Sequence, residues 1–188
     1  MADMKTNYLI ITALESELKR SALPLGVDIV YSGIGKINAT IASIKAIHQY
    51  APQHIINFGT AGKVNSQLHG LLDIAKVIQR DMNTEPLAPR GQTPFCNKPS
   101  QYLSFGKYVC GTGDSFVTSH DPWLQSQGVD VVDMELFAIA ATAHQHDIPW
   151  QALKYITDDA NENSANDWQD KVNQGQDLFI DRLKQLLS

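Results

Sequence analysis

The sequence predicts an α/β fold, and three observations support this class. Short apolar runs typical of strands alternate with stretches of helical spacing along the first 60 residues. Glycine-containing turns follow two of these strands, at residues 33–36 and 59–62. The composition, 43% hydrophobic and 19% charged, is ordinary for a globular protein. Strand–helix–strand alternation is typical of parallel strands joined by right-handed crossovers.

The first half of the chain supplies three strands and two helices. The strands are short apolar runs, over residues 8–13, 28–32 and 54–58. A first helix begins at residues 15–20, and we expect it to end near Pro24. Four isoleucines at helical spacing predict a second helix over residues 37–50: Ile37, Ile41, Ile44 and Ile47.

The second half continues this pattern after a long interruption. Further strands are predicted at residues 74–78, 107–110 and 151–157, and a closing amphipathic helix at residues 168–187. Residues 82–104 contain four prolines and few periodic apolar residues. So long an irregular connection is typical of a lid, a binding loop or a mobile segment.

Residues 129–143 change from a β-branched apolar run into an apolar helix, and two carboxylates, Asp133 and Glu135, lie at the junction. A buried carboxylate is costly unless its lone pairs are satisfied, and the N–H groups of a helix N-terminus can satisfy them. An ordinary helix cap, with Asp133 as N-cap and Glu135 in the first turn, explains the same residues.

The totals limit the function classes. At 188 residues we expect a single domain, residues 1–188. The net charge is −5 and there is no Lys/Arg run, which argues against nucleic acid or an anionic membrane as partner. Cys96 and Cys110 follow no metal or redox spacing, and they suit a reduced, cytoplasmic setting. The apolar run near the N-terminus is too short for a signal or membrane segment.

Small residues and carboxylates follow the predicted strands, where ligands of open α/β sheets bind. These positions are Glu15 and Glu17, Gly33 and Gly35, residues 59–62, residues 113–114, Asp133 and Glu135, and residues 157–159. Without a His/Cys cluster they suit zinc poorly, and we expect neither metal nor organic cofactor. They suit a substrate with hydroxyls that needs a proton and an activated water. The Gly33–Gly35 turn is only a weak match to a phosphate loop.

Six segments, taken in order, resemble the nucleoside phosphorylase and nucleosidase family of the purine/uridine phosphorylase type. Within that family they are most similar to 5′-methylthioadenosine/S-adenosylhomocysteine nucleosidases. The segments are residues 13–17, 33–36, 55–62, 113–117, 132–135 and 156–158. The resemblance implies a three-layer α/β/α sandwich with a central mixed, twisted sheet. It also implies hydrolysis of the N-glycosidic bond of a small-molecule purine nucleoside by a homodimer.

Two catalytic residues are implied by this resemblance. Asp158 would protonate purine N7, and Glu17 would hold and deprotonate the attacking water, with Thr60 nearby. Glu135 would accept hydrogen bonds from the ribose hydroxyls. Taken singly, Glu17 could instead be a solvated helix residue, and Asp158 could start a loop together with Asp159.

Four further residues are implied to bind substrate. Met134 would pack against the sugar, Phe116 would stack on the base, the Val117 backbone would read the edge of the base, and Trp168 would cover the 5′ substituent. Phe116 and Met134 could equally be core residues, and Trp168 an exposed aromatic at a helix start.

Two alternatives to hydrolysis stay open, namely a phosphorolytic purine nucleoside phosphorylase and a nucleoside-binding module without turnover. Asn57 lies where phosphorylases of the family bring an Arg to phosphate, and Glu15 and Glu17 would repel a phosphate dianion. These residues favour water as nucleophile. Lys154 replaces an Arg of many nucleosidases, and residues 82–104 lack a helix of the family, so the identity of the 5′ substituent stays open.

Overall fold

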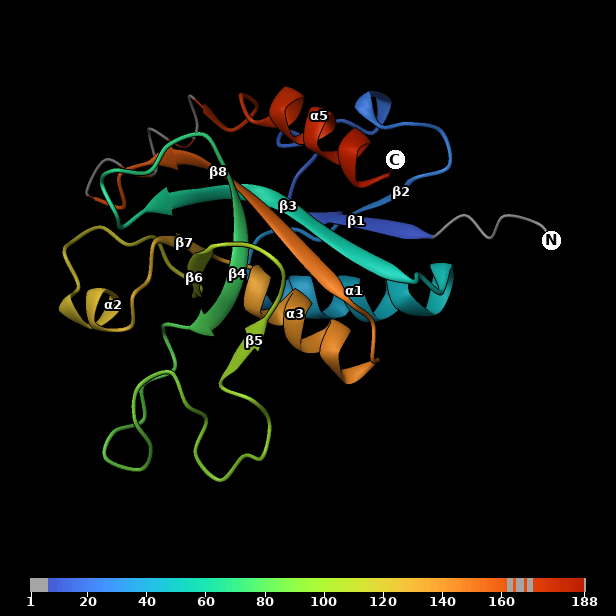
Figure 1. Cartoon of the computed structure of the whole chain (residues 1–188). Coiled ribbons are helices and arrows are strands. Elements are labelled where there is room, and N and C mark those ends of the chain that lie inside the picture. Colours follow the sequence, from blue (N-terminus) through green and yellow to red (C-terminus); the bar gives the residue numbers. More distant parts are fainter. Residues whose placement is uncertain (1–6, 162–163, 165–167, 169–170, 188) are drawn as a thin grey trace.

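The computed structural model describes residues 7–161, 164, 168 and 171–187. Its strands form one mixed, eight-stranded sheet between two helical layers, with α5 on one face and α1 and α3 on the other (Figure 1). This arrangement confirms the expected three-layer sandwich. The strands are β1 (Tyr8–Thr12), β2 (Asp28–Tyr31), β3 (His54–Lys63), β4 (Leu71–Gln79), β5 (Gln101–Leu103), β6 (Tyr108–Thr112), β7 (Val131–Asp133) and β8 (Trp150–Asp158). The helices are the 3₁₀ turn η1 (Arg20–Ala22), α1 (Lys36–Tyr50), α2 (Pro122–Ser126), α3 (Leu136–Gln145) and α5 (Gln176–Leu186).

The sheet is partly closed on itself. One path runs β2-β1-β3-β7-β6-β4-β5, and β8 pairs with both β3 and β4. The pairs β1–β2, β1–β3, β3–β8, β4–β6 and β6–β7 are parallel, whereas β3–β7, β4–β8 and β4–β5 are antiparallel. Strands β3, β8, β4, β6 and β7 therefore form a closed circuit of pairings. The ends of β3, β7 and β8 meet where the candidate site lies.

Successive side chains of the central strands point to opposite faces of the sheet, so each face has its own hydrophobic core. Leu9 and Ile11 of β1 pack on the side of α1 and α3, whereas Ile10 packs on the side of α5. On the α5 side, Phe58 stacks on Phe179 with ring centroids 4.4 Å apart. Helices therefore pack on both faces of the sheet whose strand ends form the candidate site.

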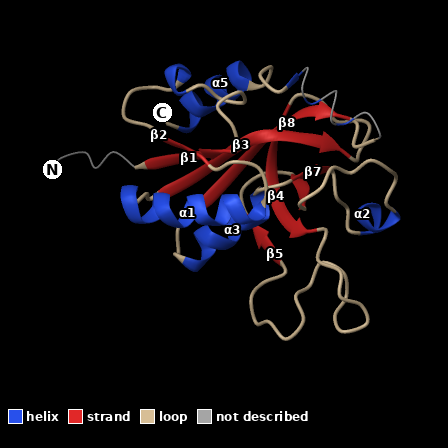
Figure 2. Ribbon diagram, turned by 180° about the vertical axis from the view of Figure 1, so that it is seen from behind, coloured by secondary structure: helices blue, strands red, loops and turns tan. Residues whose placement is uncertain are grey.

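Helix α1 packs through a face other than the isoleucine row that predicts it. The buried residues of α1 are Ala39, Ser43, Ala46 and Ile47. Three of the four isoleucines are exposed: Ile37 by 73%, Ile41 by 48% and Ile44 by 39%. Small side chains let α1 lie close to α3, and Figure 2 shows the two helices side by side on one face of the sheet. The helix was predicted correctly, but the first three isoleucines of the row lie on its outward face.

Three predicted elements are corrected. The helix expected from residue 15 is a turn followed by η1, because the Glu17 carboxylate accepts the Leu14 N–H and the chain turns there. Residues 59–62 belong to β3 and form no turn. The closing helix is interrupted: Trp168 and Lys171 are helical as predicted, residues 172–175 form a turn, and α5 begins at Gln176. A Cβ on Gly175 would lie 2.5 Å from Tyr155 Cγ. Residues 169–170 of that predicted helix lie outside the described residues.

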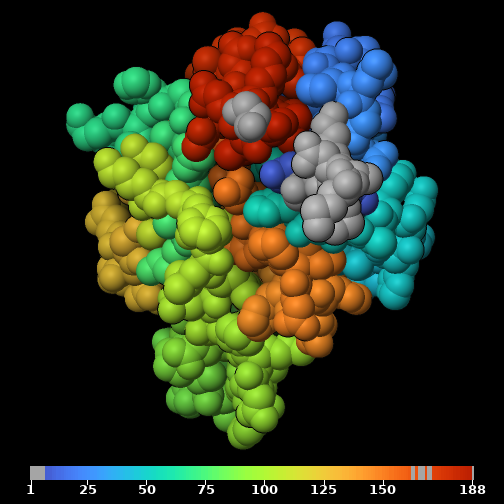
Figure 3. Space-filling view, turned by 45° about the vertical axis from the view of Figure 1, so that its right-hand side comes forward, coloured from blue at the N-terminus to red at the C-terminus, as the bar shows by residue number. Residues whose placement is uncertain are grey.

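Residues 82–104 are irregular as predicted, apart from β5. Figure 3 shows much of this green and yellow-green stretch projecting from the body of the molecule. None of its residues lines the candidate cavity, so the segment forms no lid over this chain's own site. Within the described part of the chain, no helix is long and apolar enough to cross a membrane.

Candidate active site

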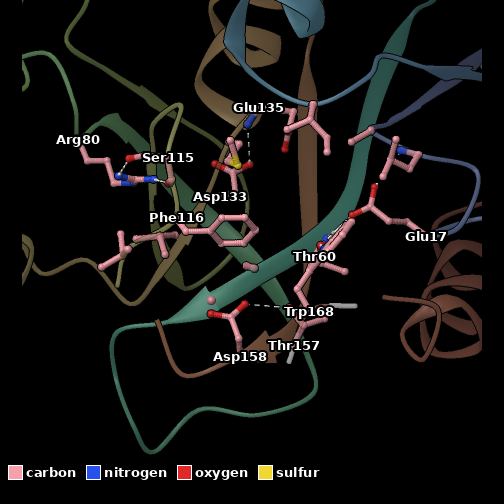
Figure 4. A pocket seen from close by; sticks show the side chains of 18 residues that line it. Glu17, Thr60, Arg80, Ser115, Phe116, Asp133, Glu135, Thr157, Asp158 and Trp168 are labelled. Atoms are coloured by element: carbon pink, nitrogen blue, oxygen red, sulfur yellow. Dashed lines mark hydrogen bonds between the residues drawn. The ribbon is translucent and has the colours of Figure 1, made fainter. Parts of the chain in front are cut away.

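All eight residues predicted to form the site line one cavity of about 200 Å³. They are Glu17, Thr60, Phe116, Val117, Met134, Glu135, Asp158 and Trp168. Figure 4 shows Glu17 and Thr60 at one end of the cavity and Arg80 and Ser115 at the other. The structure therefore brings together residues that lie far apart in the sequence, from Glu17 to Trp168.

Glu17 is held by four donors and is only 3% exposed. Its Oε1 accepts hydrogen bonds from the N–H (2.9 Å) and Oγ1 (2.8 Å) of Thr60. Its Oε2 accepts from Thr12 Oγ1 and the Leu14 N–H, both at 3.1 Å. Such an arrangement stabilises a buried carboxylate in one orientation, so Glu17 is not a solvated helix residue.

Thr60 links Glu17 to Trp168. The indole Nε1 of Trp168 donates to Thr60 Oγ1 at 2.8 Å, and Thr60 Oγ1 in turn donates to Glu17. Trp168 is half-buried and lines the cavity, so it is not an exposed aromatic. This chain of donors fixes the Glu17 end of the cavity.

Asp133 forms a buried ion pair with Lys154 beneath the cavity. Lys154 Nζ lies 2.7 Å from Asp133 Oδ2, and the two side chains are 1% and 0% exposed. The Asp133 carboxylate also accepts from Thr112 Oγ1 at 2.5 Å and from the Leu136 N–H at 2.9 Å. The helix-cap interpretation is wrong in its positions, because α3 begins at Leu136 with Glu135 as its N-cap, and Asp133 binds the first turn from two residues before that cap. Burial alone would raise the pKa of Asp133 and lower that of Lys154, but their mutual attraction reverses both directions.

Glu135 lies above this pair and has one protein donor. Its Oε1 accepts from the Gly35 N–H at 2.9 Å, and the residue is 8% exposed. Burial and the negative charges of Asp133 and Glu17 raise the pKa of Glu135 to about 8, against the opposing effect of Lys154 and the Gly35 N–H. Glu135 therefore binds its proton near neutral pH, and a positive charge that develops beside it would lower this pKa and favour the ionised form.

Backbone N–H groups at the Gly33–Gly35 turn and at the residue after it bind carboxylates of this chain. The Gly35 N–H donates to Glu135, and the Lys36 N–H donates to Asp114 Oδ1 at 2.7 Å. Gly35 has φ of 94°, a conformation that favours glycine. Because the N–H groups at the start of α1 are used in this way, the phosphate-loop interpretation is wrong for this turn.

Asp158 ends β8 and points at the cavity. Its Oδ1 accepts from the Ala160 N–H at 2.9 Å and its Oδ2 from Thr157 Oγ1 at 3.1 Å. Gly62 lies opposite, and a Cβ there would come within 2.5 Å of Asp158 Oδ1. Asp159 instead forms a surface ion pair with Lys63 at 2.9 Å and does not line this cavity.

Phe116, Val117 and Met134 supply apolar contacts in the cavity, together with other apolar residues such as Leu14 and Ile34. Phe116 is 44% exposed and Met134 is half-buried, so neither is a core residue. Figure 4 shows the Phe116 ring pointing inward. These side chains suit a flat, partly apolar ligand such as a base attached to a sugar.

Several functional features have no clear signal in the sequence. Arg80 lines the cavity but was not assigned to it, and the Asp133–Lys154 pair was not predicted; Ser115 and Thr157 lie in segments expected at the site but were given no role of their own. A lysine inside an apolar strand reads as an outward-facing residue, because its partner depends on strand register. Among the described residues, no three His, Cys, Asp or Glu side chains cluster as a metal site would require.

Comparison with known proteins identifies the family. The model of the Phosphorylase superfamily matches residues 26–188. A 5′-methylthioadenosine/S-adenosylhomocysteine nucleosidase of Staphylococcus haemolyticus is 31% identical over 160 residues, which are 72% of this chain and 69% of that protein.

Solved structures agree on the fold. The Helicobacter pylori MTAN-D198N mutant, solved with 5′-methylthioadenosine in the active site, superimposes with a TM-score of 0.82 at 20% identity, covering 92% of this chain and 94% of that chain. The futalosine hydrolase of Helicobacter pylori gives 0.82 at 20% identity, with 92% and 93% covered. The chain belongs to the phosphorylase superfamily.

Proposed function

We propose that this protein is an N-glycosyl hydrolase that splits purine nucleosides of the 5′-methylthioadenosine/S-adenosylhomocysteine type into free base and sugar. The observation that carries the proposal is the position of three carboxylates, Glu17, Glu135 and Asp158, which come from three separate segments and line one cavity. The name of the Staphylococcus haemolyticus relative supports the same substrate class.

The leaving base needs a proton, and Asp158 is the proposed donor. Its carboxylate lies at the end of the cavity that also carries Phe116 and Val117, where we place the purine. A positioned carboxylic acid that protonates N7 makes the base a better leaving group. The hydrogen bonds from Thr157 and Ala160 hold the side chain toward that position.

Breaking the N-glycosidic bond builds positive charge on the sugar, and nearby carboxylates stabilise it. Glu135 is the proposed partner of the ribose hydroxyls, with Met134 packed against the sugar. As charge develops on the sugar, the ionised form of Glu135 becomes more favourable, because an opposite charge lowers the pKa of a carboxyl. Trp168 and Thr60 lie on the proposed 5′ side.

Glu17 is the proposed base for the attacking water. Its oxygens are oriented by Thr60, Thr12 and Leu14, so its geometry does not depend on the substrate. A carboxylate at this place repels a phosphate dianion but can take a proton from water. Asn57 does not line the cavity, since its Nδ2 donates to the Ile11 carbonyl at 2.9 Å. Both features favour hydrolysis over phosphorolysis.

We also propose that residues 1–188 act as one domain, in the cytoplasm, as a homodimer. The free cysteines Cys96 and Cys110 support the reducing compartment. The exposed isoleucines Ile37, Ile41 and Ile44 form an apolar row along the outer face of α1 that a second copy would cover. Light scattering should give the mass of a dimer, and Ile37→Glu should give a monomer.

Purine release tests the function directly. The panel contains 5′-methylthioadenosine, S-adenosylhomocysteine, adenosine and futalosine, and free base is measured by chromatography. We expect base release from at least one adenine nucleoside without added metal. Binding of these nucleosides without any base release over hours would favour the nucleoside-binding module.

A further inference from the structure

Arg80 lies at the end of the cavity farthest from Glu17 and has no role in the proposed chemistry (Figure 4). It follows directly after β4, and its N–H donates to the Thr112 carbonyl at 2.8 Å, which continues the pairing with β6. The residue is only 5% exposed. A buried guanidinium is costly unless its donors are used, so its partners indicate what it does there.

The guanidinium of Arg80 binds the backbone just before Phe116. Its Nη2 donates to the carbonyl of Gly113 at 3.0 Å and to the carbonyl of Ser115. Its Nη1 lies 3.4 Å from Ser115 Oγ. Hydrogen bonds from a charged donor are stronger than neutral ones, and a planar fork can hold two acceptors in a fixed orientation.

Gly113 makes room for this guanidinium. A Cβ at Gly113 would lie 2.9 Å from Arg80 Cζ and 3.0 Å from its Cγ. The side chain of Arg80 therefore passes directly over the backbone of Gly113. This fit requires glycine at that place and brings Arg80 Nη2 to the carbonyl oxygens.

The next residue, Asp81, holds the same segment by accepting a hydrogen bond, whereas Arg80 donates hydrogen bonds to it. Its Oδ2 accepts from the Asp114 N–H at 2.8 Å, and its Oδ1 accepts from Lys36 Nζ at 2.5 Å. The cation of Arg80 thus binds the carbonyls on either side of Asp114, while the anion of Asp81 binds the intervening N–H. Two adjacent, oppositely charged residues hold two peptide groups: the one between Gly113 and Asp114, through both its C=O and its N–H, and the one between Ser115 and Phe116, through its C=O.

The segment needs this fixing because residues 113–117 belong to no helix or strand. Without a ladder of backbone hydrogen bonds, the orientation of Phe116 and Val117 depends on side-chain contacts to the peptide groups before them. Phe116 and Val117 are the residues proposed to stack on the base and to read its edge.

We propose that Arg80 and Asp81 are positioning residues that hold residues 113–115 so that the base-binding end of the cavity is preformed. This inference rests on the proposed function, because it takes the ligand of that end to be a purine base. Neither residue is proposed to touch the reacting atoms. The hydrogen bonds of Arg80 go to residues 113 and 115 of the base end, whereas Asp81 also binds Lys36, the neighbour of the Gly35 that donates to Glu135. The Arg80 variants are therefore the more specific test of the base end.

The test measures binding of the two products separately by calorimetry. Adenine reports on the base end, and 5-methylthioribose reports on the sugar end. Arg80→Met should weaken adenine binding about 10-fold to 100-fold, as expected for loss of charge-assisted hydrogen bonds, and leave 5-methylthioribose binding unchanged. Asp81→Asn, which keeps an acceptor for the Asp114 N–H, should weaken adenine binding less than Asp81→Ala.

The matched control is Arg182→Met. Arg182 is a partly exposed arginine whose Nη2 lies 3.3 Å from Asp73 Oδ1, away from the cavity. The Arg182→Met variant should bind adenine and 5-methylthioribose as tightly as the wild type does. If Arg80→Met does not fold, Arg80→Lys replaces it, since a lysine keeps the charge but lacks the planar fork and should weaken adenine binding by a smaller factor.

Each outcome separates the claims. Equal weakening of adenine and 5-methylthioribose binding, or no weakening of either, would overturn the positioning role while leaving the nucleosidase proposal intact. A wild-type protein that binds neither adenine nor 5-methylthioribose would overturn the proposed function itself. Selective loss of adenine binding in the Arg80 and Asp81 variants, but not in Arg182→Met, supports the inference.

Discussion

Lys154 Nζ lies 2.7 Å from Asp133 Oδ2 in a place where neither side chain reaches solvent. This pair lies beneath Glu135 and couples a strand, β8, to the start of α3. Its charges cancel, so the protein can bury the pair directly under a cavity that carries three further carboxylates. Removal of either partner should therefore affect both stability and the site.

Lys154→Met should destabilise the protein by about 3–5 kcal/mol, because it leaves the Asp133 carboxylate buried without a cation. Urea denaturation measures this change. The double variant Lys154→Met/Asp133→Asn should recover part of the loss, since neither residue of the pair then carries a charge. A double variant less stable than Lys154→Met would contradict the account of the pair.

The raised pKa of Glu135 predicts a pH dependence of stability. Its pKa is about 8 in the folded protein against 4.5 as the ordinary value, so the folded state binds a proton that the unfolded state has lost between these pH values. Stability should therefore fall as pH rises from about 4.5 to 8, by at most about 1.4 kcal/mol per pH unit from this group. Glu135→Gln should remove that slope, as measured by urea denaturation at several pH values. An unchanged slope in Glu135→Gln would show that Glu135 does not carry the shift.

Asp158→Asn should lower the rate of base release by about 10²–10⁴-fold, the usual contribution of a general acid. Asp159→Asn is the matched control, because Asp159 pairs with Lys63 outside the cavity, and its rate should stay near that of the wild type. A near-normal rate in Asp158→Asn together with a large loss in Asp159→Asn would reassign the acid.

Gly62→Ala should impair catalysis without removing any polar group. The added Cβ would lie 2.5 Å from Asp158 Oδ1, so the carboxylate must move from its bonds to Thr157 and Ala160. Displacement of a catalytic group by about 1 Å can cost about 10²-fold in rate. Steady-state kinetics measure the loss. Gly70→Ala is the control for backbone strain without a clash, because its Cβ would contact nothing within 4 Å although its φ of 75° disfavours alanine. A Gly62→Ala enzyme as active as Gly70→Ala would contradict the close contact.

The rim of the site could be predicted from the sequence because several of its residues directly follow strands. Asp133, Glu135 and Asp158 lie at strand ends, and the strands were visible as apolar runs. Residues 59–62 were interpreted as a turn because they contain two glycines. In the structure these glycines remain in β3, where a Cβ on Gly59 would lie 3.3 Å from Lys154 Nζ. Glycine at this position leaves room for the Lys154 side chain, a contact that only the tertiary structure reveals.

Other features of the fold and the site depend on contacts between distant residues, which the local sequence pattern does not predict. The turn at Glu17 is fixed by hydrogen bonds to Thr12 and Thr60, which overrule the helical tendency of residues 15–20. The outward face of α1 depends on which of its two apolar faces meets α3. The positions of Lys154 and Arg80 depend on strand register and on the path of residues 113–115.

The central claim is hydrolysis by water that Glu17 activates, and the sugar product tests it most directly. The wild type and Glu17→Gln are incubated with 5′-methylthioadenosine, with and without phosphate, and the sugar is identified by mass spectrometry. We predict free 5-methylthioribose at a rate independent of phosphate in the wild type, and loss of this activity in Glu17→Gln. A rate that requires phosphate and yields a sugar 1-phosphate would contradict the account.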